Sequence, residues 1–145
     1  SIGRPDHPLI HPLICQIMKN IIALAILFAS FASFASQAAE CSVEYFRKIN
    51  EDLQKTVLQK KNAIENACIG TVRIVTGVVV EVYSKSSIEI KATDGFNYTL
   101  KLQTNHNCGD IDNMAKGQKI SGKGKVENVW GNIFSMRLGD SVCIK

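Results

Sequence analysis

From Thr71 onward, apolar and polar residues alternate with a period of two, and this alternation most restricts how the chain can fold. Such a pattern is typical of strands that bury one face and expose the other. Five segments of this kind follow one another, separated by turns rich in Gly, Ser, Asn or Asp. The sequence therefore predicts a small, mainly β domain of five strands.

The first predicted strand is long and contains Gly77, which marks a bend or a bulge. We expect its buried face to carry Val72, Ile74, Val78, Val80 and Val82, and its other face Arg73, Glu81 and Tyr83. The next four strands are expected to bury Ile88, Ile90 and Ala92; Tyr98, Leu100 and Leu102; Ile120, Gly122, Gly124 and Val126; and Phe134, Met136 and Leu138.

The order of these strands predicts the architecture. A long bent strand, a hairpin at Asp94-Gly95, a longer connection over residues 103–115 and a final hairpin are typical of a five-stranded Greek-key OB-fold barrel. We expect this barrel over residues 70–145. The fold class is therefore mainly β (α+β), with one long amphipathic helix before the barrel.

That helix is predicted over residues 40–69, because residues 42–67 contain neither Gly nor Pro. Ser42 is a suitable N-cap, and Gly70 ends the segment. Lys60 and Lys61 interrupt its apolar stripe. If the stripe packs on the barrel, a charge at Leu53 would destabilise the domain. The stripe consists of Phe46, Ile49, Leu53, Val57, Ile64 and Ala67.

The first 39 residues are expected to lie outside the folded domain. Residues 18–39 have the three parts of a secretory signal peptide: Met18-Lys19-Asn20, an apolar run at 21–34, and small residues before Glu40. The run is shorter than the roughly 20 residues that span a bilayer, so no stable membrane anchor is expected. Residues 1–17 are interpreted as upstream read-through or a misplaced start. The protein is therefore expected in the bacterial periplasm or secreted.

Four cysteines follow the predicted signal peptide, and an even number in a small exported domain predicts two disulfides. Strands three and five of an OB barrel are parallel neighbours, so we expect Cys108 near Cys143. The remaining pair, Cys41 and Cys68, would lie about 40 Å apart on an unbroken helix. Either the helix breaks near Thr56, or Cys41 displaces one partner of the other pair.

Two segments carry a family resemblance. Residues 63–79 (AIENACIGTVRIVTGVV) and 116–126 (KGQKISGKGKV) resemble the tRNA_anti-like family of small exported bacterial OB-fold proteins, over roughly residues 63–143. The resemblance implies an OB barrel that binds nucleic acid or another ligand. It does not identify the ligand.

OB domains bind on the face of strands two and three and on the flanking loops. The ligand-binding candidates at those positions are Tyr83, Lys85, Lys91, Asn97, Thr99, Lys101 and Trp130. Only Tyr83 and Trp130 are expected to be free for stacking, because Tyr98 shares the side of Leu100. The competing interpretation is a solvated basic surface. The same choice applies to Lys116, Lys119, Lys123 and Lys125, which could also meet phosphates, headgroups or an acidic protein.

No catalytic residue, cofactor or metal is predicted. His106, Cys108 and Asp110 imitate a Cys-His-Asp set, but adjacency in sequence is not the geometry of a triad, and a disulfide at Cys108 removes the nucleophile. Asp110 and Asp112 lack the regular ligands of an EF-hand loop.

Three functions agree with these observations. The leading hypothesis is a non-catalytic exported OB module for a periplasmic protein, peptide or small ligand. The first alternative is an OB-fold protein that binds single-stranded nucleic acid. The net charge of +4 would favour binding to phosphates. The second is an oligosaccharide-binding subunit resembling a toxin B subunit. The sequence does not indicate the oligomeric state.

Overall fold

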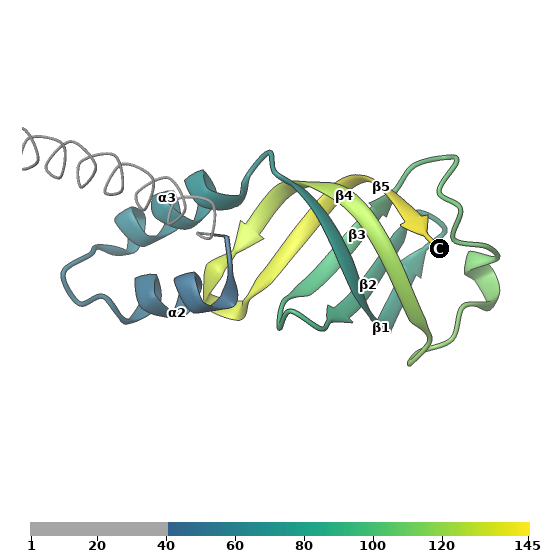
Figure 1. Cartoon of the computed structure of the whole chain (residues 1–145), viewed down its shortest axis with the longest axis horizontal. Helices are drawn as coiled ribbons and strands as arrows, with labels where there is room; N and C mark the ends of the chain where they lie inside the picture. Colours follow the sequence, from purple (N-terminus) through teal and green to yellow (C-terminus); the bar gives the residue numbers. More distant parts are fainter. Residues whose placement is uncertain (1–40) are drawn as a thin grey trace, which may run out of the picture. The chain divides into compact units, whose positions relative to one another are not determined.

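The computed structural model describes residues 41–145, so the predicted read-through segment and signal peptide lie outside the described part. Two helices precede a barrel of five strands, and the domain is mainly β (Figure 1). The elements are α2 (Val43–Glu51), α3 (Val57–Cys68), β1 (Val72–Ser84), β2 (Ser87–Ala92), β3 (Asn97–Leu102), η1 (Ile111–Asn113), β4 (Lys119–Trp130), η2 (Gly131–Ile133) and β5 (Ser135–Ile144).

The strands close a barrel in the order β1-β2-β3-β5-β4. The β3–β5 pair is parallel, and the other four pairs are antiparallel. β1 pairs with both β2 and β4, and Gly77 faces Ala92 on one side and Ile120 on the other. A Cβ atom at Gly77 would lie 2.7 Å from the Cα of Ala92. The crossing of β1 and β2 at this point therefore requires glycine.

The buried residues of four strands agree with the sequence pattern, whereas the buried face predicted for most of β1 is wrong. Val75 and Val79 enter the core, while Val72 and Ile74 are 60% and 67% exposed. Both faces of β1 carry apolar residues, so alternation alone does not identify the inner one. A register shift between Val79 and Glu81 then exchanges the faces, which leaves Val82 partly buried against the core.

The prediction of one long helix is also wrong, because α2 ends at Glu51 and α3 begins at Val57. Thr56 caps α3 in a capping box with Gln59, and Asp52 accepts a hydrogen bond from the backbone N–H of Gln54. These local bonds compete with a continuous helix. The alternative of a break near Thr56 is thus the correct one.

The helical break brings Cys41 to Cys68, which form a disulfide with a Cα–Cα distance of 5.2 Å. The parallel β3–β5 pair directs the chain so that Cys108 bonds to Cys143, at 5.0 Å. Two disulfides suggest an oxidising, extracellular environment. Within residues 41–145, neither helix has the length and apolar character needed to span a membrane.

The helical hairpin packs on one end of the barrel (Figure 1). Phe46 is fully buried, and its ring centroid lies 4.8 Å from that of Phe96 in an edge-on contact. Ile64 packs at Gly131, where a Cβ atom would lie 2.5 Å from the Cδ1 of Ile64. Glycine at position 131 therefore allows α3 to approach the β4–β5 connection closely.

The apolar stripe predicted for one long helix is divided between α2 and α3, so Leu53 is not expected to pack on the barrel. Leu53 lies between the helices and is 92% exposed, whereas Ile49 is buried. Leu53→Asp should therefore change the free energy of unfolding by less than about 0.5 kcal/mol. Ile49→Asp should lower it by about 3 kcal/mol or more, because the charge is forced into the core. Urea unfolding of both variants tests this division, and a large loss for Leu53→Asp would contradict it.

Candidate functional site

The strand register places most of the predicted binding residues on one side of the barrel. Ile88, Ile90, Tyr98 and Leu100 point inward, so their neighbours in β2 and β3 point outward. Two rows of paired residues cross β2, β3, β5 and β4 in that order. We call these rows the outer face: Lys91, Asn97, Ser135 and Trp130 form the first row, and Glu89, Thr99, Arg137 and Asn128 the second.

The centre of the outer face is an arginine stacked on the only tryptophan. The Cζ atom of Arg137 lies 5.5 Å from the centroid of the Trp130 ring, which is a cation–π distance. Trp130 is 37% exposed. The Nε–H of Arg137 is buried, and no residue of the described part accepts its hydrogen bond. The pair thus combines a partly accessible aromatic surface with a fixed positive charge.

Two lysines extend the positive charge of this face. Lys91 and Lys101 are exposed, and neither has a carboxylate of residues 41–145 within ion-pair distance. Lys91 lies on β2 and Lys101 on β3. Glu89 of β2 accepts a 2.5 Å hydrogen bond from the hydroxyl of Tyr83. That bond raises the pKa of Tyr83 above its ordinary value. The phenol of Tyr83 is therefore engaged, although its ring is exposed.

Lys85 is directed elsewhere and forms an ion pair with Asp112 at 3.5 Å. Of the seven candidates from sequence, the outer face thus includes Lys91, Asn97, Thr99 and Trp130. Lys101 continues it along β3, and Tyr83 approaches it through Glu89. Arg137 was missed by sequence reasoning. Its position opposite the buried Met136 and Leu138 would have indicated it once β5 was placed beside β3.

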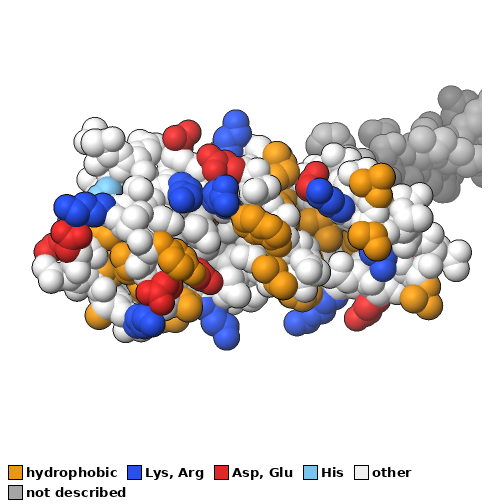
Figure 2. Space-filling model, turned by 180° about the vertical axis from the view of Figure 1, so that it is seen from behind, with side chains coloured by type: hydrophobic (Ala, Val, Ile, Leu, Met, Phe, Trp, Pro, Cys, Tyr) orange, Lys and Arg blue, Asp and Glu red, His pale blue; other side chains and the backbone are white. Residues whose placement is uncertain are grey.

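The second basic cluster is divided between two environments. Lys116 pairs with Glu81 at 3.1 Å, and this hydrogen bond lowers the pKa of the Glu81 carboxyl. Lys119, Lys123 and Lys125 project from β4 opposite the exposed Val78, Ile74 and Val72 of β1. Figure 2 shows the face of the molecule turned away from the viewer in Figure 1, and on it basic, acidic and hydrophobic side chains are interspersed. That side therefore lacks one continuous area of positive charge.

In the loop that contains His106, the side chains of His106, Cys108 and Asp110 are all engaged in bonds that stabilise the loop. The Sγ of Cys108 is bonded to Cys143, and the Nδ1 of His106 accepts the backbone N–H of Cys108 at 3.0 Å. Asp110 caps η1 by accepting the backbone N–H of Asp112. In the part of the chain with described coordinates, no three His, Cys, Asp or Glu residues gather in an arrangement that could hold a metal ion.

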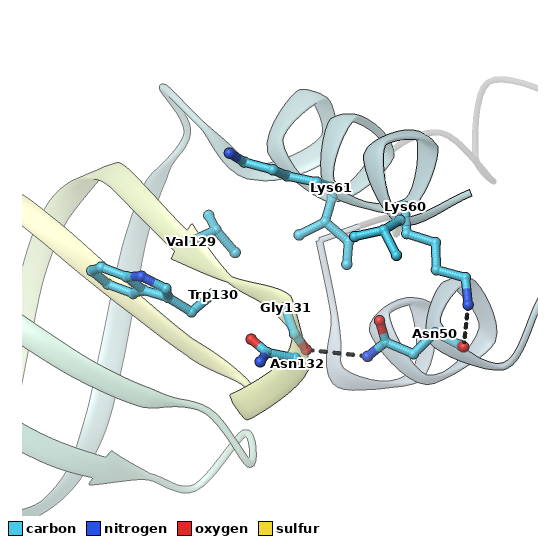
Figure 3. A pocket seen from close by; sticks show the side chains of 9 residues that line it. Asn50, Lys60, Lys61, Val129, Trp130, Gly131 and Asn132 are labelled. Carbon is cyan, nitrogen blue, oxygen red and sulfur yellow. Dashed lines mark hydrogen bonds between the residues drawn. The ribbon is translucent and has the colours of Figure 1, made fainter. Parts of the chain in front are cut away.

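A pocket of about 430 Å³ lies between the helical hairpin and the end of β4 (Figure 3). Ile64 of α3 and Val129 of β4 line it, and Val57, Lys60 and Lys61 lie along its α3 side. Trp130 and Gly131 also line it, and the indole of Trp130 points along the barrel away from the helices. Sequence reasoning did not find this pocket, because it depends on the helical break.

A partly buried polar network around the buried Tyr98 joins the barrel to the start of the hairpin. The hydroxyl of Tyr98 donates to Asp94 at 2.5 Å and accepts the Nε–H of Arg73 at 3.0 Å. Arg73 also donates to the carbonyl oxygen of Cys41 at 3.0 Å. Burial, and then the bond to Asp94, raises the pKa of Tyr98 above its ordinary value. Arg73 partly opposes this change.

The raised pKa predicts a loss of stability at alkaline pH. Tyrosine in the unfolded chain ionises near pH 10, whereas folded Tyr98 keeps its proton to higher pH. The free energy of unfolding should therefore fall as pH rises above about 10. Tyr98→Phe should lower stability at neutral pH by about 1–2 kcal/mol and make the alkaline decline shallower. Urea unfolding between neutral and alkaline pH measures both effects, and parallel pH profiles would exclude this role for Tyr98.

The chain was compared with known proteins. No protein-family model matches it, and no curated protein matches it. Among solved structures, replication protein A of U. maydis bound to single-stranded DNA is similar, with a TM-score of 0.37 and 13% identity. That match covers 57% of this chain and 68% of the other. A likeness of this extent does not transfer a ligand from one protein to the other.

Proposed function

We propose that this chain is a non-catalytic OB-fold binding module that is exported to the bacterial periplasm or secreted. The strand order and the parallel β3–β5 pair support an OB fold. The two disulfides support a site of action outside the cytoplasm. Membership of the tRNA_anti-like family remains a prediction from the sequence.

The observation that carries the proposal is the Trp130–Arg137 pair on the outer face. OB domains generally bind their ligands on strands two and three with the flanking loops. The outer face includes β2 and β3, and Trp130 stands at the start of the connection from β4 to β5. A partly exposed indole supplies a flat apolar surface, and the guanidinium beside it supplies a positive charge. Ligand sites commonly combine an apolar surface with a few placed polar groups.

The neighbours of this pair favour a polar, uncharged ligand. Asn97, Thr99 and Asn128 offer hydrogen-bonding side chains in the adjacent register positions. Glu89, in the same row as Thr99, would repel a continuous phosphate backbone. A peptide backbone or an oligosaccharide meets these conditions. Single-stranded nucleic acid is the second candidate, because Lys91, Lys101 and Arg137 accompany an aromatic platform.

The fluorescence of Trp130 can test these candidates, because the protein contains no other tryptophan. The oxidised protein would be titrated with a short gluco-oligosaccharide, a short uncharged peptide and a short oligothymidylate, at low and moderate salt. We expect a saturable change with an uncharged probe and little dependence on salt. A saturable change with oligothymidylate alone, falling steeply with salt, would favour the nucleic-acid alternative instead.

Arg137→Gln should weaken binding of the successful uncharged probe about tenfold, which corresponds to about 1.4 kcal/mol. Arg47→Gln is a matched control, because Arg47 is an exposed arginine of α2 whose Cζ lies 6.0 Å from the ring of Phe134. It should leave the affinity unchanged. Equal affinities of the wild-type protein and Arg137→Gln would contradict the location of the site.

A further inference from the structure

The pocket beside α3 presents an arrangement of side chains that packing alone does not explain. Positions 57, 60, 61 and 64 are separated by three, four and seven residues and therefore share one face of a helix. This face lines the pocket and carries two lysines between Val57 and Ile64. Leu58, in contrast, does not line the pocket and is 64% exposed. On a helix face used only for packing, apolar residues would replace the two lysines, and a polar residue would stand at the exposed position of Leu58.

The two lysines extend toward opposite ends of the pocket (Figure 3). The Nζ of Lys60 donates to the backbone carbonyl of Asn50 at 2.7 Å, and the Nδ2 of Asn50 donates to the carbonyl of Gly131 at 3.1 Å. These two bonds hold the ammonium of Lys60 beside the α2 wall. Lys61 is more exposed and lies 3.9 Å from Glu65.

The ammonium group of Lys60, unlike that of Lys61, has no acidic partner among residues 41–145. Its one backbone bond leaves two of the three ammonium donors for other acceptors. An anion at this end of the pocket would therefore meet a positioned positive charge without displacing an acidic partner.

The remainder of the pocket is suited to an apolar group. Ile64 and Val129 are almost completely buried, while Val57 is 86% exposed beside them. A volume of about 430 Å³ falls within the range of small-molecule sites. Aliphatic walls beside ammonium groups select an anion that has an apolar body, and they disfavour both inorganic anions and cations.

We propose that this pocket binds an aliphatic monocarboxylate, with its chain against Val57, Ile64 and Val129 and its carboxylate on Lys60. The site shares Trp130 with the outer face but uses no other residue of it, and it does not depend on the function proposed for that face. Trp130 lines the pocket, and its indole points along the barrel away from the helices.

Isothermal titration calorimetry of the oxidised protein with decanoate, 1-decanol and acetate tests the proposal. We expect saturable binding of decanoate at one site, about tenfold weaker binding of 1-decanol, and no measurable binding of acetate. Equal affinity for decanoate and 1-decanol would overturn the role of the charge. Absence of saturable binding of decanoate, or binding of acetate as tight as that of decanoate, would overturn the site itself.

Substitutions then locate the two halves of the ligand. Lys60→Gln should weaken decanoate at least fivefold, Lys60→Arg should retain most of the affinity, and Lys48→Gln on the exposed side of α2 should have no effect. Val57→Ser should weaken decanoate binding, whereas Leu58→Ser, which changes another exposed apolar residue of the same helix, should not. Thermal unfolding of each variant separates lost binding from lost structure. Equal effects within either matched pair, in variants that remain folded, would overturn the proposal.

Discussion

The parallel pairing of β3 with β5 is the constraint on which the rest of this structure depends, because it closes the barrel. It brings Arg137 beside Thr99 and thereby connects β2 and β3 to β4 across one continuous outer face. It also directs the chain segments after β3 and at the end of β5 to the same place, where Cys108 bonds to Cys143. A parallel neighbour needs a long connection, and between β3 and β5 the chain supplies it with the segment 103–118, which contains η1, and with β4 and η2.

The second constraint is the break between α2 and α3, which converts a segment of helical periodicity into a hairpin on one end of the barrel. The Cys41–Cys68 disulfide ties the two ends of this hairpin together, and Arg73 connects its first residue to Tyr98 and Asp94. A straight helix would have left Cys41 remote and would have produced no pocket beside β4. The pocket is therefore a consequence of capping residues that also define where the helices end.

Much of the fold could be predicted from local periodicity, because β2 to β5 each have one apolar and one polar side. The inner face of β1 could not, since its residues are apolar on both sides and a register shift exchanges the faces near Val79. The helical break was recognisable only as a conflict between the spacing of Cys41 and Cys68 and the length of a helix. Arg137 was missed because its importance comes from neighbours on other strands, and the pocket because its walls come from α2, α3 and β4.

The central feature of the proposed binding site is an accessible tryptophan, Trp130, with the positive charge of Arg137 on one side of its ring. Fluorescence quenching of Trp130 by iodide and by caesium, at equal ionic strength, measures this arrangement without knowledge of a ligand. The account predicts that iodide quenches more efficiently than caesium, and that Arg137→Gln reduces the difference while Arg47→Gln does not. Equal quenching by both ions, or a difference that Arg137→Gln leaves unchanged, would contradict the cationic aromatic platform on the outer face.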